Sequence, residues 1–168
     1  MPRAAAEKRR FALDQNFPAP VVGAFAALMP RVELVPIARI DPALAELADW
    51  ELFVALHRRE PRWDGLITND DSLLALPKEM TVLSQTNLSL IVALGEGHSP
   101  IRAVGVLLCH LSHICHHILP DRSQIWPLRV SQKSPEEPSA FLEKIAAKRR
   151  MTMQALYDQH KLAPAELR

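Results

Sequence analysis

The sequence predicts an α/β fold of three layers, with helices on both faces of a mostly parallel sheet. Short apolar segments typical of buried strands alternate along the chain with longer segments in which apolar residues recur at helical spacing. The chain has 168 residues, of which 48% are hydrophobic, so a single domain can enclose a substantial core. No internal repeat or low-complexity tract interrupts this alternation.

Each predicted element depends on a local signal. Asp41 and Pro42 form the clearest helix start, an N-cap followed by proline at the first helical position. Pro127 identifies the last strand as an edge strand, because proline cannot donate to a ladder. In chain order the signals predict strand 11–14, a helix that stops at Pro30, strand 32–37, a helix from 41 to about 59, strand 65–68, a brief helix 73–76, strands 80–83 and 88–93, helix 101–119, strand 125–130, and an amphipathic helix from 140 to about 160.

The same signals divide the chain into three parts. Residues 1–130 are expected to form the α/β domain, with residues 1–10 as a basic arm or the start of a first helix. Residues 131–139 contain two prolines and no apolar side chain, which predicts a linker. Residues 140–168 form a C-terminal helical appendage that could dock on its own domain, on a second copy, on another protein or on RNA.

Composition and charge exclude several classes of protein. Lys+Arg 20 and Asp+Glu 19 nearly cancel, and together with the apolar content this excludes a disordered chain. Cys109 and Cys115 lie too close together to hold a disulfide-built scaffold. No apolar run is long enough to cross a bilayer, so a cytoplasmic protein with no membrane partner is expected.

Acidic residues follow two of the predicted strands. Asp14 ends the first strand, and Asp70 and Asp71 come soon after the third. Ligands of parallel sheets bind outside the carboxyl ends of the strands. Asp49 belongs to the helix between these strands and has apolar neighbours, so its carboxylate needs solvent, a basic partner or a metal ion. A hard divalent cation, Mg²⁺ or Mn²⁺, would relieve the repulsion among converging carboxylates.

Each of these acids also has an ordinary structural interpretation. Asp14 could form an Asx-turn, and Asp70 could act only as a helix N-cap. Asp49 could be solvated or paired with Arg58 or Arg59. Only their order and spacing, taken together, favour a shared metal site.

Three segments resemble the PIN-like domain family. Residues 11–18 (FALDQNFP) are similar to the first strand and loop of that family, with its pattern apolar-apolar-Asp-x-Asn-x-Pro. Asp49 matches the second acid of the family, and residues 64–73 (DGLITNDDSL) resemble its apolar-apolar-Thr-x-Asp-x-x-Phe/Leu element. The resemblance extends from about residue 11 to 92 and more weakly to 130.

The resemblance implies a Mg²⁺- or Mn²⁺-dependent ribonuclease, a hydrolase that is often the toxin of a toxin–antitoxin pair. RNA, an antitoxin protein and a second copy are the partners that it implies. By the same resemblance, Asp14, Asp49 and Asp70 are the catalytic metal ligands, supported by Asn16, Thr68 and Asn69. Many active members have a fourth acid after the third. Asp71 is the only candidate that the sequence offers, and neighbouring residues of a helical turn face different ways.

The chemistry of such a site requires both a metal ion and basic groups. A metal-bound water becomes a nucleophile near neutral pH and attacks a phosphodiester, while the metal stabilises the leaving oxygen. Arg58, Arg59 and Arg62 are the candidate RNA-binding cluster, although a solvated basic face is the ordinary interpretation of such residues.

Two further interpretations remain open from the residues alone. His110, His113 and His117 share one face of the predicted helix 101–119, which permits a zinc site but is also typical of a polar helix edge. A catalytically silent PIN-like scaffold that binds RNA or protein is the main alternative to a nuclease. A receiver-like or phosphatase domain is a third alternative, but neither Lys78 nor Lys133 lies where a receiver requires a lysine.

Overall fold

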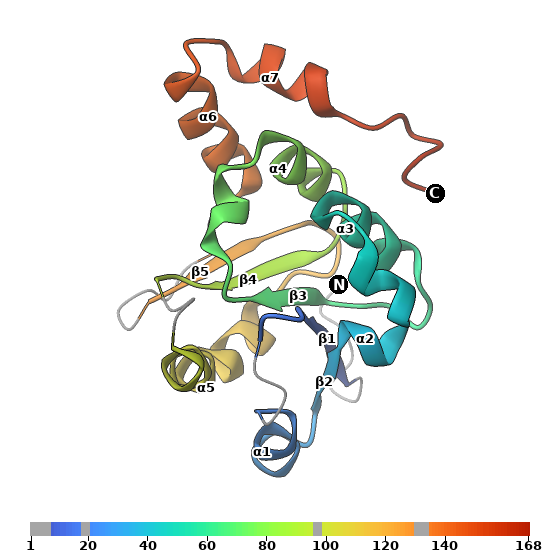
Figure 1. Cartoon of the computed structure of the whole chain (residues 1–168), viewed down its shortest axis with the longest axis vertical. Coiled ribbons are helices and arrows are strands. Elements are labelled where there is room, and N and C mark those ends of the chain that lie inside the picture. Colours follow the sequence, from blue (N-terminus) through green and yellow to red (C-terminus); the bar gives the residue numbers. More distant parts are fainter. Residues whose placement is uncertain (1–7, 18–20, 96–98, 130–134) are drawn as a thin grey trace.

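The computed structural model describes residues 8–17, 21–95, 99–129 and 135–168, which build one five-stranded sheet with helices on both faces (Figure 1). The strand order is β2-β1-β3-β4-β5, and all neighbouring strands are parallel, which confirms the predicted fold class. Residues 1–7 of the expected basic arm and residues 131–134 of the expected linker lie outside the described residues. The strands are β1 (Arg9–Leu13), β2 (Val32–Pro36), β3 (Gly65–Thr68), β4 (Ser89–Ala93) and β5 (Ile125–Leu128).

Alternation along the strands creates two separate cores. Successive strand residues point to opposite faces, so both faces of this buried sheet carry apolar side chains. On one face, helices α3, α4, α6 and α7 cover Ala12, Leu66, Leu90, Val92 and Ile125. On the other, helices α1 and α5 cover Phe11, Leu13, Ile67, Ile91, Ala93, Trp126 and Leu128.

The helices connect the parallel strands and then extend beyond the last strand. They are α1 (Val21–Leu28), α2 (Ile37–Ile40), the 3₁₀ helix η1 (Pro42–Glu46), α3 (Asp49–Arg58), the 3₁₀ helix η2 (Asp71–Ala75), α4 (Pro77–Ser84), α5 (Pro100–His117), α6 (Pro138–Lys148) and α7 (Met153–His160). A bilayer-spanning helix is not found in the described part of the chain, since every helix there is too short or too polar.

The prediction of a strand at residues 80–83 is wrong, because these residues belong to helix α4. A short apolar run does not by itself distinguish a buried strand from a buried helix. Here Met80, Thr81, Val82 and Leu83 are all buried, and Pro77 begins the helix at its first position. A helix is also what the topology needs, because β3 and β4 are parallel neighbours and require a crossover between them.

The single helix predicted from 41 to about 59 is also wrong, because it is divided in two. Asp41 caps η1 by accepting a 3.0 Å hydrogen bond from the Ala43 N–H, and the chain is then extended at Ala48. Glu51 accepts a 3.0 Å hydrogen bond from the Ala48 N–H and so closes the start of α3. The division makes Asp49 the first residue of α3 rather than a residue in the middle of a long helix.

The C-terminal helix predicted from 140 to about 160 is likewise two helices, α6 and α7. The chain turns between them at Arg150, whose φ is 55°. Leu142, Ile145 and Leu156 are buried in the same core as α3 and α4, and Figure 1 shows α6 and α7 beyond α4. Just before α6, Glu136 forms an antiparallel bridge with Ile125 of β5.

Gly65 at the start of β3 allows a close approach to the neighbouring strand. A Cβ atom at this position would lie 2.5 Å from the backbone oxygen of Ser89 on β4. We expect Gly65→Ala to lower the free energy of unfolding by roughly 1–3 kcal/mol, because backbone atoms cannot turn away as a side chain can. Urea unfolding measures the difference, and Gly23→Ala in α1 is the control, since its Cβ would meet nothing within 4 Å. Equal effects of the two substitutions would contradict this account.

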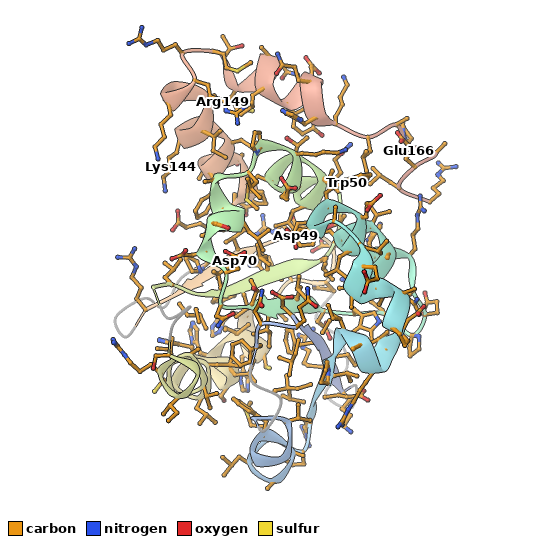
Figure 2. All side chains as sticks on the ribbon, viewed as in Figure 1. Asp49, Trp50, Asp70, Lys144, Arg149 and Glu166 are labelled. Carbon is orange, nitrogen blue, oxygen red and sulfur yellow. The ribbon has the colours of Figure 1, made fainter. Side chains whose placement is uncertain are left out.

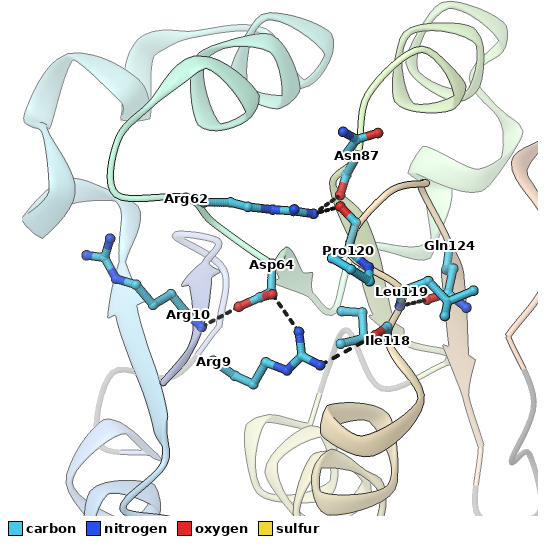
Figure 3. Close-up of polar contacts among 9 residues, drawn as sticks. All are labelled: Arg9, Arg10, Arg62, Asp64, Asn87, Ile118, Leu119, Pro120 and Gln124. Atoms are coloured by element: carbon cyan, nitrogen blue, oxygen red, sulfur yellow. Dashed lines mark hydrogen bonds and ion pairs between the residues drawn. The ribbon is translucent and has the colours of Figure 1, made fainter. Parts of the chain in front are cut away.

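The amino edge of the sheet is held by a buried ion pair (Figure 3). The Asp64 side chain, 1% exposed, accepts hydrogen bonds from Arg9 Nη1 at 2.9 Å and from the Arg10 N–H at 2.8 Å. Arg9 also donates to the Ile118 carbonyl oxygen at 3.5 Å, at the end of α5. Asp64 is therefore a structural carboxylate that ties β1 to the start of β3, at the edge opposite to the acids that follow the strands.

Candidate active site

The site begins where β1 and β3 end side by side. Leu13 pairs with Ile67 across these strands, and the Asp14 N–H donates a 2.9 Å hydrogen bond to the Ile67 carbonyl oxygen. By alternation, Asp14 lies on the same face as Ala12, and Thr68 lies on the same face as Leu66. Asp14 and Thr68 therefore lie on the side of the sheet that α3 and α4 cover.

A chain of hydrogen bonds connects the two strand ends. The buried Thr68 hydroxyl donates to Asp14 Oδ2 at 2.8 Å and accepts from the Asp70 N–H at 3.0 Å. The Gln15 N–H donates to the other carboxylate oxygen of Asp14 at 2.7 Å. Asp70 in turn caps η2 by accepting from the Ser72 N–H at 2.9 Å. Both carboxylates are therefore held by the local turn, with acceptor capacity remaining on each.

Asp49 is the first residue of α3 and the third member of the predicted acid group, Asp14, Asp49 and Asp70. Figure 2 shows Asp49 and Asp70 on the α4 side of the sheet. Burial raises the pKa of Asp49, and the charges of Asp14, Glu79 and Asp70 raise that pKa further. Each of these charges is therefore close enough to Asp49 to disfavour its ionisation.

Asp14 is half-buried directly after β1. Burial is the main cause that raises the pKa of Asp14, and the charge of Asp70 adds to it. Hydrogen bonds from Thr68, from the Gln15 backbone and from the Asn16 side chain stabilise the carboxylate and oppose this rise. A carboxyl group that is destabilised by burial and like charge, yet held by hydrogen bonds, is typical of a functional site.

Glu79 is the acidic residue that the sequence analysis missed. It is half-buried in the first turn of α4, and its charge contributes to the raised pKa of Asp49. The expected strand 80–83 concealed it, since a residue before a strand has no reason to approach Asp49. Pro77 followed by an acid two residues later is a helix-start signal that could have revealed it.

The other predicted site residues have different surroundings. Asp71 is exposed, and its Oδ2 accepts a 3.1 Å hydrogen bond from the Gly95 N–H beyond the end of β4. Asn16 is exposed beside Asp14, whereas Asn69 is buried between Thr68 and Asp70. The structure thus places Asn16 and Asn69 beside the acids and uses Asp71 to connect η2 to the loop after β4.

The three arginines predicted to bind RNA do not border the acids. Arg58 is the last residue of α3, and Arg59 and Arg62 lie between α3 and the amino end of β3, at the opposite edge of the sheet. Arg58 donates to the Glu166 carbonyl oxygen, Arg59 pairs with Asp41, and Arg62 donates to the Pro120 carbonyl oxygen. These side chains are engaged within the fold at the far edge, because a helix that connects parallel strands returns to the edge where the next strand begins.

The histidines of α5 are arranged as a helix edge. His110 is buried, and its Nε2 lies 2.7 Å from the Arg129 carbonyl oxygen. The rings of His113 and His117 are stacked with centroids 4.1 Å apart, and His113 also meets the edge of Trp126 at 6.0 Å. These contacts show the three histidines packing against neighbouring residues of the fold along one face of α5.

The acid group has the chemistry that a hard divalent cation prefers. Its donors are carboxylate oxygens, and among the described residues no lysine or arginine forms an ion pair with Asp14, Asp49 or Asp70. Within the same described ranges, no three His, Cys, Asp or Glu side chains stand close enough together to hold an ion as they are. Direct coordination by three of these acids would therefore require side-chain movement.

Comparisons with protein-family models, with curated proteins and with solved structures yield no significant match.

Proposed function

We propose that this protein is a Mg²⁺- or Mn²⁺-dependent ribonuclease of the PIN-like type. The observation that supports the proposal is that Asp14 and Asp70 follow neighbouring parallel strands and are connected through the Thr68 hydroxyl by hydrogen bonds of 2.8 and 3.0 Å. The charges of both acids also act on Asp49 at the start of α3. The order of these acids along the chain and the segments around Asp14 and Asp70 resemble that family. A role as a toxin restrained by an antitoxin protein belongs to the same proposal.

In this proposal each residue has a defined task. Asp14, Asp49 and Asp70 would hold the cation, which when bound activates water and stabilises negative charge at the phosphodiester. Thr68 fixes one oxygen of Asp14 through its 2.8 Å hydrogen bond and fixes the backbone of Asp70 through the 3.0 Å bond. Asn16 supports the Asp14 carboxylate by a hydrogen bond, and Glu79 adds a fourth negative charge beside Asp49. Such supporting contacts orient metal ligands and tune their basicity.

The proposal is tested by titrating the protein with Mn²⁺ in a calorimeter while following cleavage of a single-stranded RNA. A nuclease binds Mn²⁺ in a manner that depends on Asp14 and cleaves RNA only with the metal, and EDTA stops the cleavage. Binding of RNA without Asp14-dependent Mn²⁺ binding would replace the proposal with the silent scaffold.

The pH dependence of metal binding follows from the raised pKa values of Asp14 and Asp49. Protons compete with the metal for these carboxylates, so we expect the rise in Tm caused by Mn²⁺ to be full at a pH above the raised pKa values and to shrink as the pH falls through them. Without metal, the folded state binds these protons more tightly than the unfolded state. The two groups therefore oppose folding above their folded pKa values, and this opposition disappears as the pH falls through them. Thermal unfolding with and without Mn²⁺ across this range measures both effects, and a pH-independent increment would contradict the first.

A further inference from the structure

An RNA substrate at the acid group requires basic side chains to bind its phosphates, and the predicted arginines do not lie where they could supply them. A polyanionic strand approaching several carboxylates needs basic groups along its path. Arg58, Arg59 and Arg62 lie at the opposite edge and are engaged there. A different basic residue, Lys78, lies in the first turn of α4, the turn that also carries Glu79.

Lys78 contacts the residue that follows Asp49 in α3. It precedes Glu79, whose charge acts on Asp49, and its Nζ lies 3.5 Å from the centre of the Trp50 ring. Trp50 follows Asp49 at the start of α3 and is labelled near it in Figure 2. The contact therefore joins the first turns of α3 and α4, which carry Asp49 and Glu79.

The Lys78–Trp50 contact leaves the ammonium group able to bind an anion. An ammonium group over an indole ring is held by the ring's negative face, which does not neutralise its charge. Among the described residues, no carboxylate forms an ion pair with Lys78. Lys78 is half-buried, as is Trp50, so the ring limits the freedom of a side chain that would otherwise be mobile.

We propose that Lys78, held in place by Trp50, binds a backbone phosphate of single-stranded RNA next to the phosphodiester that is cleaved. This inference rests on the proposed nuclease function and adds a substrate-binding subsite to it. Lys78 contributes to binding and Trp50 is a positioning residue for it. Neither is required for the chemical step, since the acids that would hold the metal are separate groups.

The test compares Lys78→Gln with a matched control, Lys144→Gln, using a fluorescein-labelled single-stranded RNA. Lys144 also lies over an aromatic ring, with its Nζ 4.7 Å from the centre of Phe141, but it pairs with Glu136 and belongs to α6. We expect Lys78→Gln to raise KM several-fold with kcat unchanged, and to reduce the slope of log affinity against log salt by about 0.7, the value of one single-strand phosphate contact. Lys144→Gln should change neither.

Trp50 variants test the positioning role. Trp50→Phe keeps an aromatic face and should retain the wild-type KM, whereas Trp50→Leu should raise KM in the same direction as Lys78→Gln. The double variant Trp50→Leu/Lys78→Gln should be no weaker than Lys78→Gln alone, because the ring acts through the lysine. Additive losses would show that Trp50 does not act through Lys78 and would overturn this part.

The outcomes separate this inference from the proposed function. If the wild type cleaves RNA with metal and Lys78→Gln behaves like Lys144→Gln, the inference is overturned and the nuclease stands. If the wild type binds RNA without cleaving it and the salt slope still falls in Lys78→Gln, the subsite stands and the nuclease is overturned. If the wild type neither cleaves nor binds RNA, both are overturned.

Discussion

Asp14→Asn and Asp70→Asn are each expected to reduce Mn²⁺-dependent RNA cleavage by at least about a hundredfold. Each substitution keeps the size of the side chain but removes one negative oxygen donor, which a hard divalent cation requires. Asp14 has the stronger structural case, because both of its carboxylate oxygens accept hydrogen bonds, from the Thr68 hydroxyl at 2.8 Å and from the Gln15 N–H at 2.7 Å. Initial rates with a labelled RNA, measured at saturating Mn²⁺, give the comparison.

The matched control for this result is Asp158→Asn. Asp158 is an exposed aspartate of α7 that pairs with Lys161 at 2.7 Å, so the same chemical change occurs away from the acid group. It should leave cleavage at the wild-type rate, and all variants should unfold cooperatively. Full cleavage by the double variant Asp14→Asn/Asp70→Asn would exclude this mechanism.

Asp64→Ala is expected to lower the free energy of unfolding by about 3–5 kcal/mol, the largest loss of stability that we predict. Asp64 is buried, and its removal leaves the partly buried Arg9 guanidinium and the Arg10 N–H without their acceptor. The penalty comes from the uncompensated charge and donor more than from the lost attraction. Urea unfolding, with the m-value compared between variants, measures the difference.

Glu33→Ala provides the control for Asp64→Ala. Glu33 accepts from Arg10 Nε at 2.9 Å, but its side chain is 37% exposed, so water can replace the contact. We expect a loss of less than about 1 kcal/mol for this exposed pair. A similar loss in both variants would show that the burial of Asp64 does not determine its contribution.

Local sequence signals were sufficient where an element is defined by its own residues. The strands of the sheet were predicted from short apolar runs, apart from the false strand at 80–83, and Pro127 correctly identified β5 as an edge strand. The Asp41 cap also formed as expected, although the helix after it divides at Ala48. The strand predicted at 80–83 was false because its apolar run reflects a buried helix: Met80 and Val82 belong to α4 and pack in the same core as the buried residues of α3.

The candidate site was predicted only in part. Asp14 and Asp70 follow strands, so the edge where they meet follows from parallel topology alone. Which charges act on Asp49 depends on how α3 and α4 pack. The charge of Glu79 is one of them because the segment after Pro77 is helical. Helix packing also explains why Arg58, Arg59 and Arg62 do not lie beside the acids, since α3 leads the chain to the opposite edge of the sheet.

Local patterns in the sequence were enough to indicate the five strands of the sheet, with one false strand besides, and the acids that follow two of them, because apolar periodicity and turn chemistry act over a few neighbouring residues. The charges that raise the pKa of Asp49 and the contact of Lys78 with the Trp50 ring become visible only in the folded protein. These contacts join residues that are far apart along the chain. They depend on strand order, crossover direction and helix packing, which arise when the whole core is buried.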